Sequence, residues 1–230
     1  MSARMLFFGV WPYLALAVCV TALVWRWRHD QLGWTSRTSQ LLERRWLAWG
    51  SPLFHYGALL AILGHAVGLL VPESWTQAWG VSEHAYHVFA VGGGVLAGLL
   101  VTVGLVILLA RRVVFRHRLR MVTNRWDLVV LPLLAVVVLL GMSVTFGTQV
   151  LGGGYDYRAT VSLWLRSLFT GNPDVALMAS APLVYRVHVV AAFLLFALWP
   201  MTRLVHVFSV PLGYLARPYV VYRSRAVAGR

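Results

Sequence analysis

The chain has 230 residues, of which 60% are hydrophobic and 12% charged, and its mean hydropathy is +0.73. This composition excludes an ordinary soluble globular domain and predicts a protein of the lipid bilayer. The formal net charge of +13 would indicate nucleic-acid binding in a soluble protein, but in a membrane protein it belongs to the loops, and we expect no nucleic-acid partner.

Five apolar runs are long enough to cross the hydrocarbon core, which takes about 20 helical residues. In chain order they cover residues 5–27, 52–71, 85–110, 128–150 and 181–207. Several tryptophans lie near the ends of these runs, where amphipathic rings collect at the lipid surface. The sequence therefore predicts an all-α integral membrane protein, a single domain over residues 1–230 built as a bundle of five transmembrane helices, followed by a tail at 208–230.

The arginines predict how the bundle is oriented. Sixteen of the 20 basic residues follow the first, third and fifth runs, and all 20 are arginine. Because cytoplasmic loops carry the excess of positive charge, we expect the N-terminus outside and the C-terminal tail in the cytoplasm. The same charge can attract anionic lipid or form a docking surface for a cytoplasmic subunit, and the two roles are compatible.

Two of the runs each carry two histidines in an apolar setting, His55 and His65 in the second, His188 and His206 in the fifth. An imidazole is costly in lipid unless it has a partner. Because the two helices run in opposite directions, His55 should meet His206 near the inner surface, and His65 should meet His188 near the outer surface. His188 and His206 are 18 residues apart, five turns of one continuous helix, so we expect them on the same face.

Two facing imidazoles suit the iron of a porphyrin, which needs two axial ligands, better than zinc or copper, which take three or four clustered ligands. The four histidines therefore predict two heme sites, each held from both sides. The alternative is that each histidine is bonded to a backbone carbonyl of another helix and holds no metal.

Glycines on the second and third runs admit two interpretations. These residues are Gly57, Gly64, Gly68, Gly92, Gly93, Gly94, Gly98 and Gly104. They can leave room for a flat porphyrin ring, or they can allow close packing of helices through the small-xxx-small pairs Gly64/Gly68 and Gly94/Gly98.

Several motifs resemble one known family. The stretch from Trp199 to Tyr219, WPMTRLVHVFSVPLGYLARPY, closely resembles the end of the last transmembrane helix in gamma subunits of membrane-bound respiratory nitrate reductase. Further similar stretches are WPY at 11–13, SQLLER at 39–44, LFHYG at 53–57, GH at 64–65 and YRVH at 185–188. The resemblance covers nearly the whole chain, and all four histidines keep their place relative to the flanking residues.

The resemblance implies a diheme b-type cytochrome of a bacterial or archaeal cytoplasmic membrane. Such a subunit oxidises quinol near the outer face and passes electrons through two heme b groups to an iron–sulfur subunit and a molybdenum catalytic subunit, which it anchors on the cytoplasmic side. Carried over to this chain, His65 and His188 would ligate the outer heme, and His55 and His206 the inner one. The only cysteine, Cys19, cannot hold an iron–sulfur cluster alone, so the clusters belong to a partner chain.

The quinol site departs from the family pattern, which implicates a lysine near the start of the third helix, because this sequence has no lysine. Gly64, His84 and His87 are our candidates for the quinol site, since histidine titrates in the useful range and bonds a quinol oxygen readily. In the alternative interpretation, His84 and His87 simply face water or lipid headgroups.

Three arginines at the predicted inner end, Arg203, Arg111 and Arg112, are candidates to pair with heme propionates. Alternatively they anchor helix ends at the membrane surface. Other hypotheses for the chain are the membrane cytochrome of a sulfite-reduction-linked or heterodisulfide-reductase-like complex, a heme-free membrane anchor, and a transporter in which the histidines relay protons.

Overall fold

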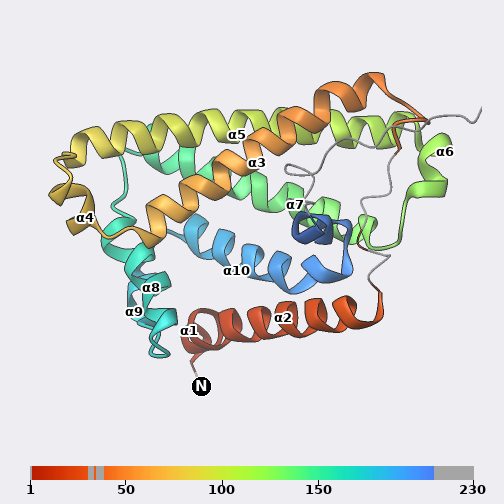
Figure 1. Cartoon of the computed structure of the whole chain (residues 1–230). Coiled ribbons are helices and arrows are strands. Elements are labelled where there is room, and N and C mark those ends of the chain that lie inside the picture. The colour runs from red at the N-terminus through yellow and green to blue at the C-terminus, as the bar shows by residue number, and fades with distance from the viewer. Residues whose placement is uncertain (1, 31–33, 35–38, 210–230) are drawn as a thin grey trace, which may run out of the picture.

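The computed structural model describes residues 2–30, 34 and 39–209, and all regular structure in this part of the chain is helical (Figure 1). The long helices are α2 (Trp11–His29), α3 (Arg45–Leu70), α5 (Glu83–Val114), α7 (Asp127–Met142) and α10 (Leu183–Leu198). The first span begins with α1 (Ala3–Met5) and the π turn η1 (Leu6–Val10), which lead directly into α2. The fourth span extends beyond α7 as the π-helix η4 (Ser143–Val150). Of the predicted tail at 208–230, everything after residue 209 lies outside the described residues.

Shorter segments connect the long ones. They are α4 (Glu73–Ala78), α6 (Arg116–Leu119), η3 (Arg120–Val122), η5 (Arg158–Ser162), α8 (Leu163–Phe169), α9 (Val175–Ser180), η6 (Trp199–Met201) and η7 (Arg203–Ser209). Figure 1 shows α4, α8 and α9 gathered at one end of the bundle, which we call the α4 end, and α6 at the opposite, α6 end.

Five helices are long and apolar enough to cross a membrane, which confirms the predicted fold class. They cover Ala3–His29, Arg45–Leu70, Glu83–Val114, Asp127–Val150 and Leu183–Met201. The second begins seven residues earlier than predicted, so Pro52 lies inside α3 and does not start it.

The fifth helix is shorter than predicted. α10 ends at Leu198, and the chain continues through two 3-10 segments, the first of which contains Pro200. Proline has no backbone N–H to donate, and its ring clashes with the carbonyl one turn earlier, so the α-helix does not continue past it. The expectation that His188 and His206 lie five turns apart on one continuous helix is therefore wrong, because His206 belongs to η7.

Glycines allow a close approach at the most extensive helix contact in the bundle, which is between α3 and α5. A Cβ atom on Gly57 would overlap the backbone of Val101, and one on Gly104 would overlap the backbone of Phe54. Close helix packing thus explains these two glycines. A Cβ on Gly64 would meet only open space, so Gly64 is not a packing glycine in this structure.

The remaining helices complete a layer beside this pair. α10 packs against α2 and α7, and the segment between the fourth and fifth spans folds over the α4 end. There the indole of Trp164, which is 1% exposed, donates a hydrogen bond to the Phe8 carbonyl at 2.9 Å. This hydrogen bond ties α8 to the first span.

Candidate metal centres

The four histidines meet in two pairs that join α3 to the C-terminal elements. His65 of α3 faces His188 of α10, with ring centroids 6.1 Å apart and ring planes at 27°. His55 of α3 faces His206 of η7, again with centroids 6.1 Å apart, but with ring planes at 66°. We call these the α10 pair and the η7 pair. The structure brings together the same partners that helix direction predicted.

Local hydrogen bonds orient three of the four rings. Nδ1 of His55 lies 2.7 Å from the Ser51 carbonyl, and Nδ1 of His65 lies 2.7 Å from the Ala61 carbonyl, each one turn earlier in α3. Nδ1 of His206 bonds the carbonyl of Arg203. A carbonyl oxygen only accepts, so Nδ1 carries the proton, and in a neutral ring Nε2 keeps its lone pair for a metal.

This geometry fits heme iron. Two imidazoles that bind one metal from opposite sides through Nε2 have ring centroids roughly 6 Å apart, because each metal–nitrogen bond is about 2.0 Å and each ring centroid lies about 1 Å beyond its nitrogen. Within the described part of the chain, no group of three or more His, Cys, Asp or Glu residues could hold a metal ion. A two-histidine set, with Nδ1 bonded to a carbonyl in three of the four rings, is suited to an iron whose other ligands come from a porphyrin.

The surroundings of the α10 pair combine open space with a close contact. Gly64, directly before His65, has open space where its Cβ would be, whereas a Cβ on Gly141 of α7 would lie 3.2 Å from Cε1 of His188. Nδ1 of His188 is buried near the Val137 carbonyl without reaching hydrogen-bond geometry. Gly141 could not be predicted from the sequence, because no spacing or motif distinguishes it within α7.

Arg111 ties α5 to the segment that precedes α3. Its Nε donates to the Glu43 carboxylate at 2.6 Å, and its Nη2 donates to the carbonyls of Ser39 and Glu43. Burial alone would raise the pKa of the Glu43 carboxyl, but hydrogen bonds from the Trp46 backbone N–H and from Arg111 outweigh it, so the pKa is lowered. The carboxylate is therefore the stable form.

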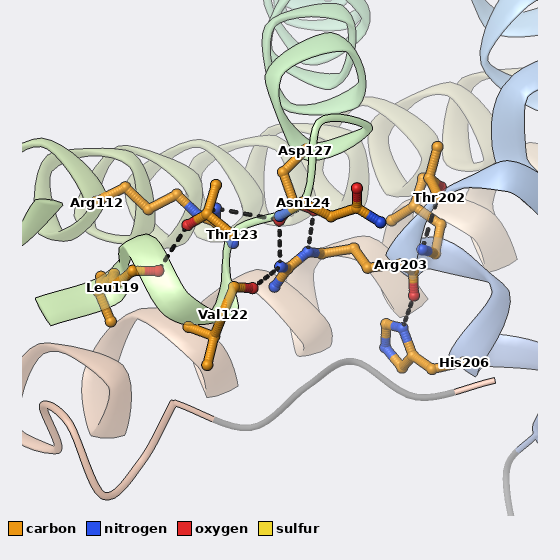
Figure 2. Close-up of polar contacts among 10 residues, drawn as sticks. Arg112, Leu119, Val122, Thr123, Asn124, Asp127, Thr202, Arg203 and His206 are labelled. Atoms are coloured by element: carbon orange, nitrogen blue, oxygen red, sulfur yellow. Dashed lines mark hydrogen bonds and ion pairs between the residues drawn. The ribbon is translucent and has the colours of Figure 1, made fainter. Parts of the chain in front are cut away.

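Arg112 and Arg203 share another carboxylate, that of Asp127, at the start of α7 (Figure 2). All three arginines that we proposed as propionate partners thus contact acidic side chains of this chain, and their role toward propionates stays a prediction. Asp127 and Glu43 were not predicted as partners of these arginines; the signal that could have pointed to them is the rarity of acidic residues, with 7 Asp and Glu in the whole chain.

The quinol-site candidates lie at the α4 end. His84 and His87 are exposed near the start of α5, and a Cβ on Gly154 would lie 3.8 Å from Cε1 of His87 and 3.9 Å from Oε1 of Gln149. The assignment of Gly64, His84 and His87 to quinol stays a prediction.

The buried guanidinium of Arg158, which was not among the residues predicted from the sequence, lies at the same end. Arg158 is 7% exposed, pairs with Glu83 at 3.2 Å, donates to Thr76 at 3.0 Å and lies 3.9 Å over the ring of Tyr86. Burial, reinforced by the neighbouring Tyr86 hydroxyl, raises the pKa of Tyr157, so Tyr157 stays protonated. Arg158 is one of only four arginines outside the arginine-rich loops, which is the signal that could have pointed to it.

Five helices long and apolar enough to cross a membrane, with two facing histidine pairs between α3 and the C-terminal elements, define a multi-pass, all-helical membrane protein. The family model for the nitrate reductase gamma subunit matches residues 4–225. The chain therefore belongs to the nitrate reductase gamma subunit family, as its motifs predicted, and it is a multi-pass protein of the bacterial cytoplasmic membrane.

Individual relatives agree with this assignment. The chain is 45% identical over 226 residues to the nitrate reductase gamma chain of Bacillus subtilis, covering 98% of this chain and 100% of the relative. It is 33% identical over 224 residues to the respiratory nitrate reductase 1 gamma chain of Escherichia coli K12, covering 96% and 98%. It is also 48% identical over 221 residues to the nitrate reductase-like protein NarX of Mycobacterium tuberculosis, covering 96% of this chain but only 34% of that longer protein.

Proposed function

We propose that this chain is the diheme b-type cytochrome of a quinol-oxidising nitrate reductase. The observation that carries the proposal is the pair of facing imidazoles at each of two depths, with centroids 6.1 Å apart in both cases. The names of the relatives in Bacillus subtilis and Escherichia coli support nitrate as the acceptor of the complex.

The two histidine pairs lie at different depths along α3. His55 and His65 are ten residues apart on α3, which corresponds to about 15 Å along the helix axis. With the N-terminus outside, the α10 pair would hold the outer heme and the η7 pair would hold the inner heme. Heme bound by these histidines would supply one-electron transfer between the outer face and the cytoplasmic side.

The protein controls where protons go. Oxidation of quinol to quinone would release two electrons and two protons at the outer face. His84 or His87 would accept one proton from a quinol oxygen, water at the membrane surface would accept the other, and Gly64 would leave room for the quinol ring. Electrons that move inward while protons stay outside charge the membrane, which stores about 2.3 kcal/mol per charge per 100 mV.

The partners are an iron–sulfur subunit and a molybdenum catalytic subunit, which this chain anchors at the cytoplasmic face. Arginine-rich segments at the α6 end supply a positive docking surface. Arg116, Arg118 and Arg120 are exposed there. Since the chain spans 34% of the Mycobacterium relative, fusion to further domains is also compatible with the family.

The test is to purify the complex from native membranes in mild detergent and to measure heme content, the reduced-minus-oxidised spectrum and quinol-dependent nitrate reduction on one sample. We expect b-type bands, two hemes per chain and heme reoxidation by nitrate. A colourless complex would show instead that the chain is a heme-free anchor. Hemes that sulfite or a disulfide reoxidises, but nitrate does not, would assign the chain to one of the related complexes.

A further inference from the structure

Asp127 is a buried carboxylate on which two structural elements converge beside the η7 pair. It is 2% exposed. Its Oδ1 accepts a hydrogen bond from Nε of Arg203 at 2.6 Å, and its Oδ2 accepts from Nη2 of the same residue (Figure 2). Oδ2 also accepts from Nη1 of Arg112 at 3.3 Å and from the Asn124 backbone N–H at 3.0 Å.

The contact between Asp127 and Arg203 is a directional one. A buried carboxylate is costly unless it is paired and its lone pairs are satisfied. The two parallel bonds between a guanidinium fork and a carboxylate fix both position and angle, which a single point contact does not. Asp127 therefore holds the Arg203 side chain in one place relative to α5 and α7.

Arg203 in turn holds His206. Its backbone carbonyl accepts the hydrogen bond from Nδ1 of His206, and Figure 2 shows the imidazole beneath this carbonyl. His55 and His65 bond carbonyls within the regular turns of α3, whereas Arg203 and His206 belong to a seven-residue 3-10 segment that follows the break at Pro200. A short 3-10 segment has poorer hydrogen-bond geometry than an α-helix, so its position depends more on side-chain contacts.

We propose that Asp127 is a positioning residue for the inner-heme ligand His206 and acts through Arg203. This inference rests on the proposed function, because it takes His206 to be a heme ligand. The carboxylate fixes Arg203, the Arg203 carbonyl fixes Nδ1 of His206, and Nε2 of His206 is thereby directed toward His55.

The same carboxylate sets the charge beside the inner heme. Asp127 compensates two guanidinium groups, those of Arg112 and Arg203. Without it, two uncompensated positive charges would remain near the η7 pair. Positive charge favours the reduced form of the iron, so the inner heme would become easier to reduce.

The experiment is Asp127→Asn in the full complex, with heme content, a potentiometric titration and the low-spin ferric electron paramagnetic resonance signals measured together. Asparagine keeps the shape but loses the charge and the two-pronged contact. We expect the inner-heme signal to shift, its potential to rise and some inner heme to be lost, while the outer heme keeps its signal and potential. Unchanged signals from both hemes would overturn the proposal.

Two further variants serve as controls. The first is Asp174→Asn. Asp174 is exposed at the α4 end, and its side chain accepts a hydrogen bond from the Ala176 backbone N–H at 3.1 Å that an asparagine can also accept, so neither heme should change. If Asp127→Asn loses both hemes, Asp127→Glu distinguishes a specific effect on His206 from general misfolding. The retained carboxylate should restore the outer heme and most of the inner one. Equal loss of both hemes in Asp127→Glu would refute a specific link to His206.

The outcomes separate this inference from the proposed function. A wild-type complex without heme contradicts the proposed function itself. A wild-type complex with two hemes, of which neither responds to Asp127→Asn, leaves the proposed function intact and removes only the role of Asp127.

Discussion

The two histidine pairs show two different ways to hold an imidazole inside a membrane protein. In the α10 pair, both rings stand on long α-helices and are nearly parallel, at 27°, with Gly141 against the ring of His188. In the η7 pair, one ring stands on a short 3-10 segment, the rings are at 66°, and ion pairs brace the surroundings. In the first pair both rings stand on regular α-helices, whereas in the second only His55 does, and an ion pair holds Arg203 in the short segment that carries His206.

The largest expected effect comes from the ligands themselves. His188→Ala should remove the outer heme and stop reduction of the remaining heme by quinol, because the entry point for electrons is lost. His55→Ala should remove the inner heme while quinol still reduces the outer one. Heme quantitation and stopped-flow reduction by quinol measure both effects, and a two-heme spectrum in the His55→Ala complex would contradict the assignment of His55.

Glycines at the α3–α5 contact should come next, because α3 carries one histidine of each pair. Gly57→Ala places a methyl group onto the backbone of Val101, and overpacking of this kind costs about 1–3 kcal/mol or more. We expect a lower temperature of heme release in detergent and perturbation of both hemes. Gly92→Ala, at a position with open space, is the matched control and should behave as wild type.

A change at Gly141 should affect the α10 pair alone. In Gly141→Ala the new methyl group lies 3.2 Å from the His188 ring, so the ring must shift by a few tenths of an ångström. The outer-heme spectrum should change and the inner-heme spectrum should not. Gly147→Ala, in the π-helical extension with open space around it, is the control. Equal perturbation of the outer-heme and inner-heme spectra would contradict a contact that affects the α10 pair alone.

The smallest effect concerns Glu43, whose folded-state pKa is lowered. Such a group contributes stability above its unfolded pKa, about 4.3, and the contribution disappears as the pH falls through the folded pKa. The wild type should therefore be more stable than Glu43→Gln near pH 7, and the difference should vanish in acid. Thermal unfolding of both proteins between pH 3 and 7 tests this, and a pH-independent difference would exclude the Glu43 charge as its cause.

The sequence predicted the spans and the partners of the histidines for simple physical reasons. The bilayer sets the length of an apolar run, so five runs predicted five helices, and the direction of each helix predicted that His65 meets His188 and His55 meets His206. The apolar pattern of the fifth run did not predict that α10 ends before Pro200. The apolar pattern continues to residue 207, and hydropathy does not distinguish an α-helix from a 3-10 segment of the same composition.

The glycines show the same limit at single positions. Gly57 and Gly64 look alike in the sequence, since both lie in α3 near a histidine. Only the packed structure shows that Gly57 touches the backbone of α5 and that Gly64 faces open space. A small residue predicts the possibility of a close approach, but the neighbouring helix decides whether it occurs.

The amino-acid sequence by itself determined the membrane class, the five spans, the family and the two histidine pairs, because apolar length, helix direction and local motifs are properties of contiguous chain. Tertiary structure decided which carboxylates hold the arginines. Asp127 and Arg203 are 76 residues apart, and Glu43 and Arg111 are 68 apart. Contacts of this kind form only when separate helices converge, and a buried charge is stable there because it finds an opposite charge within reach.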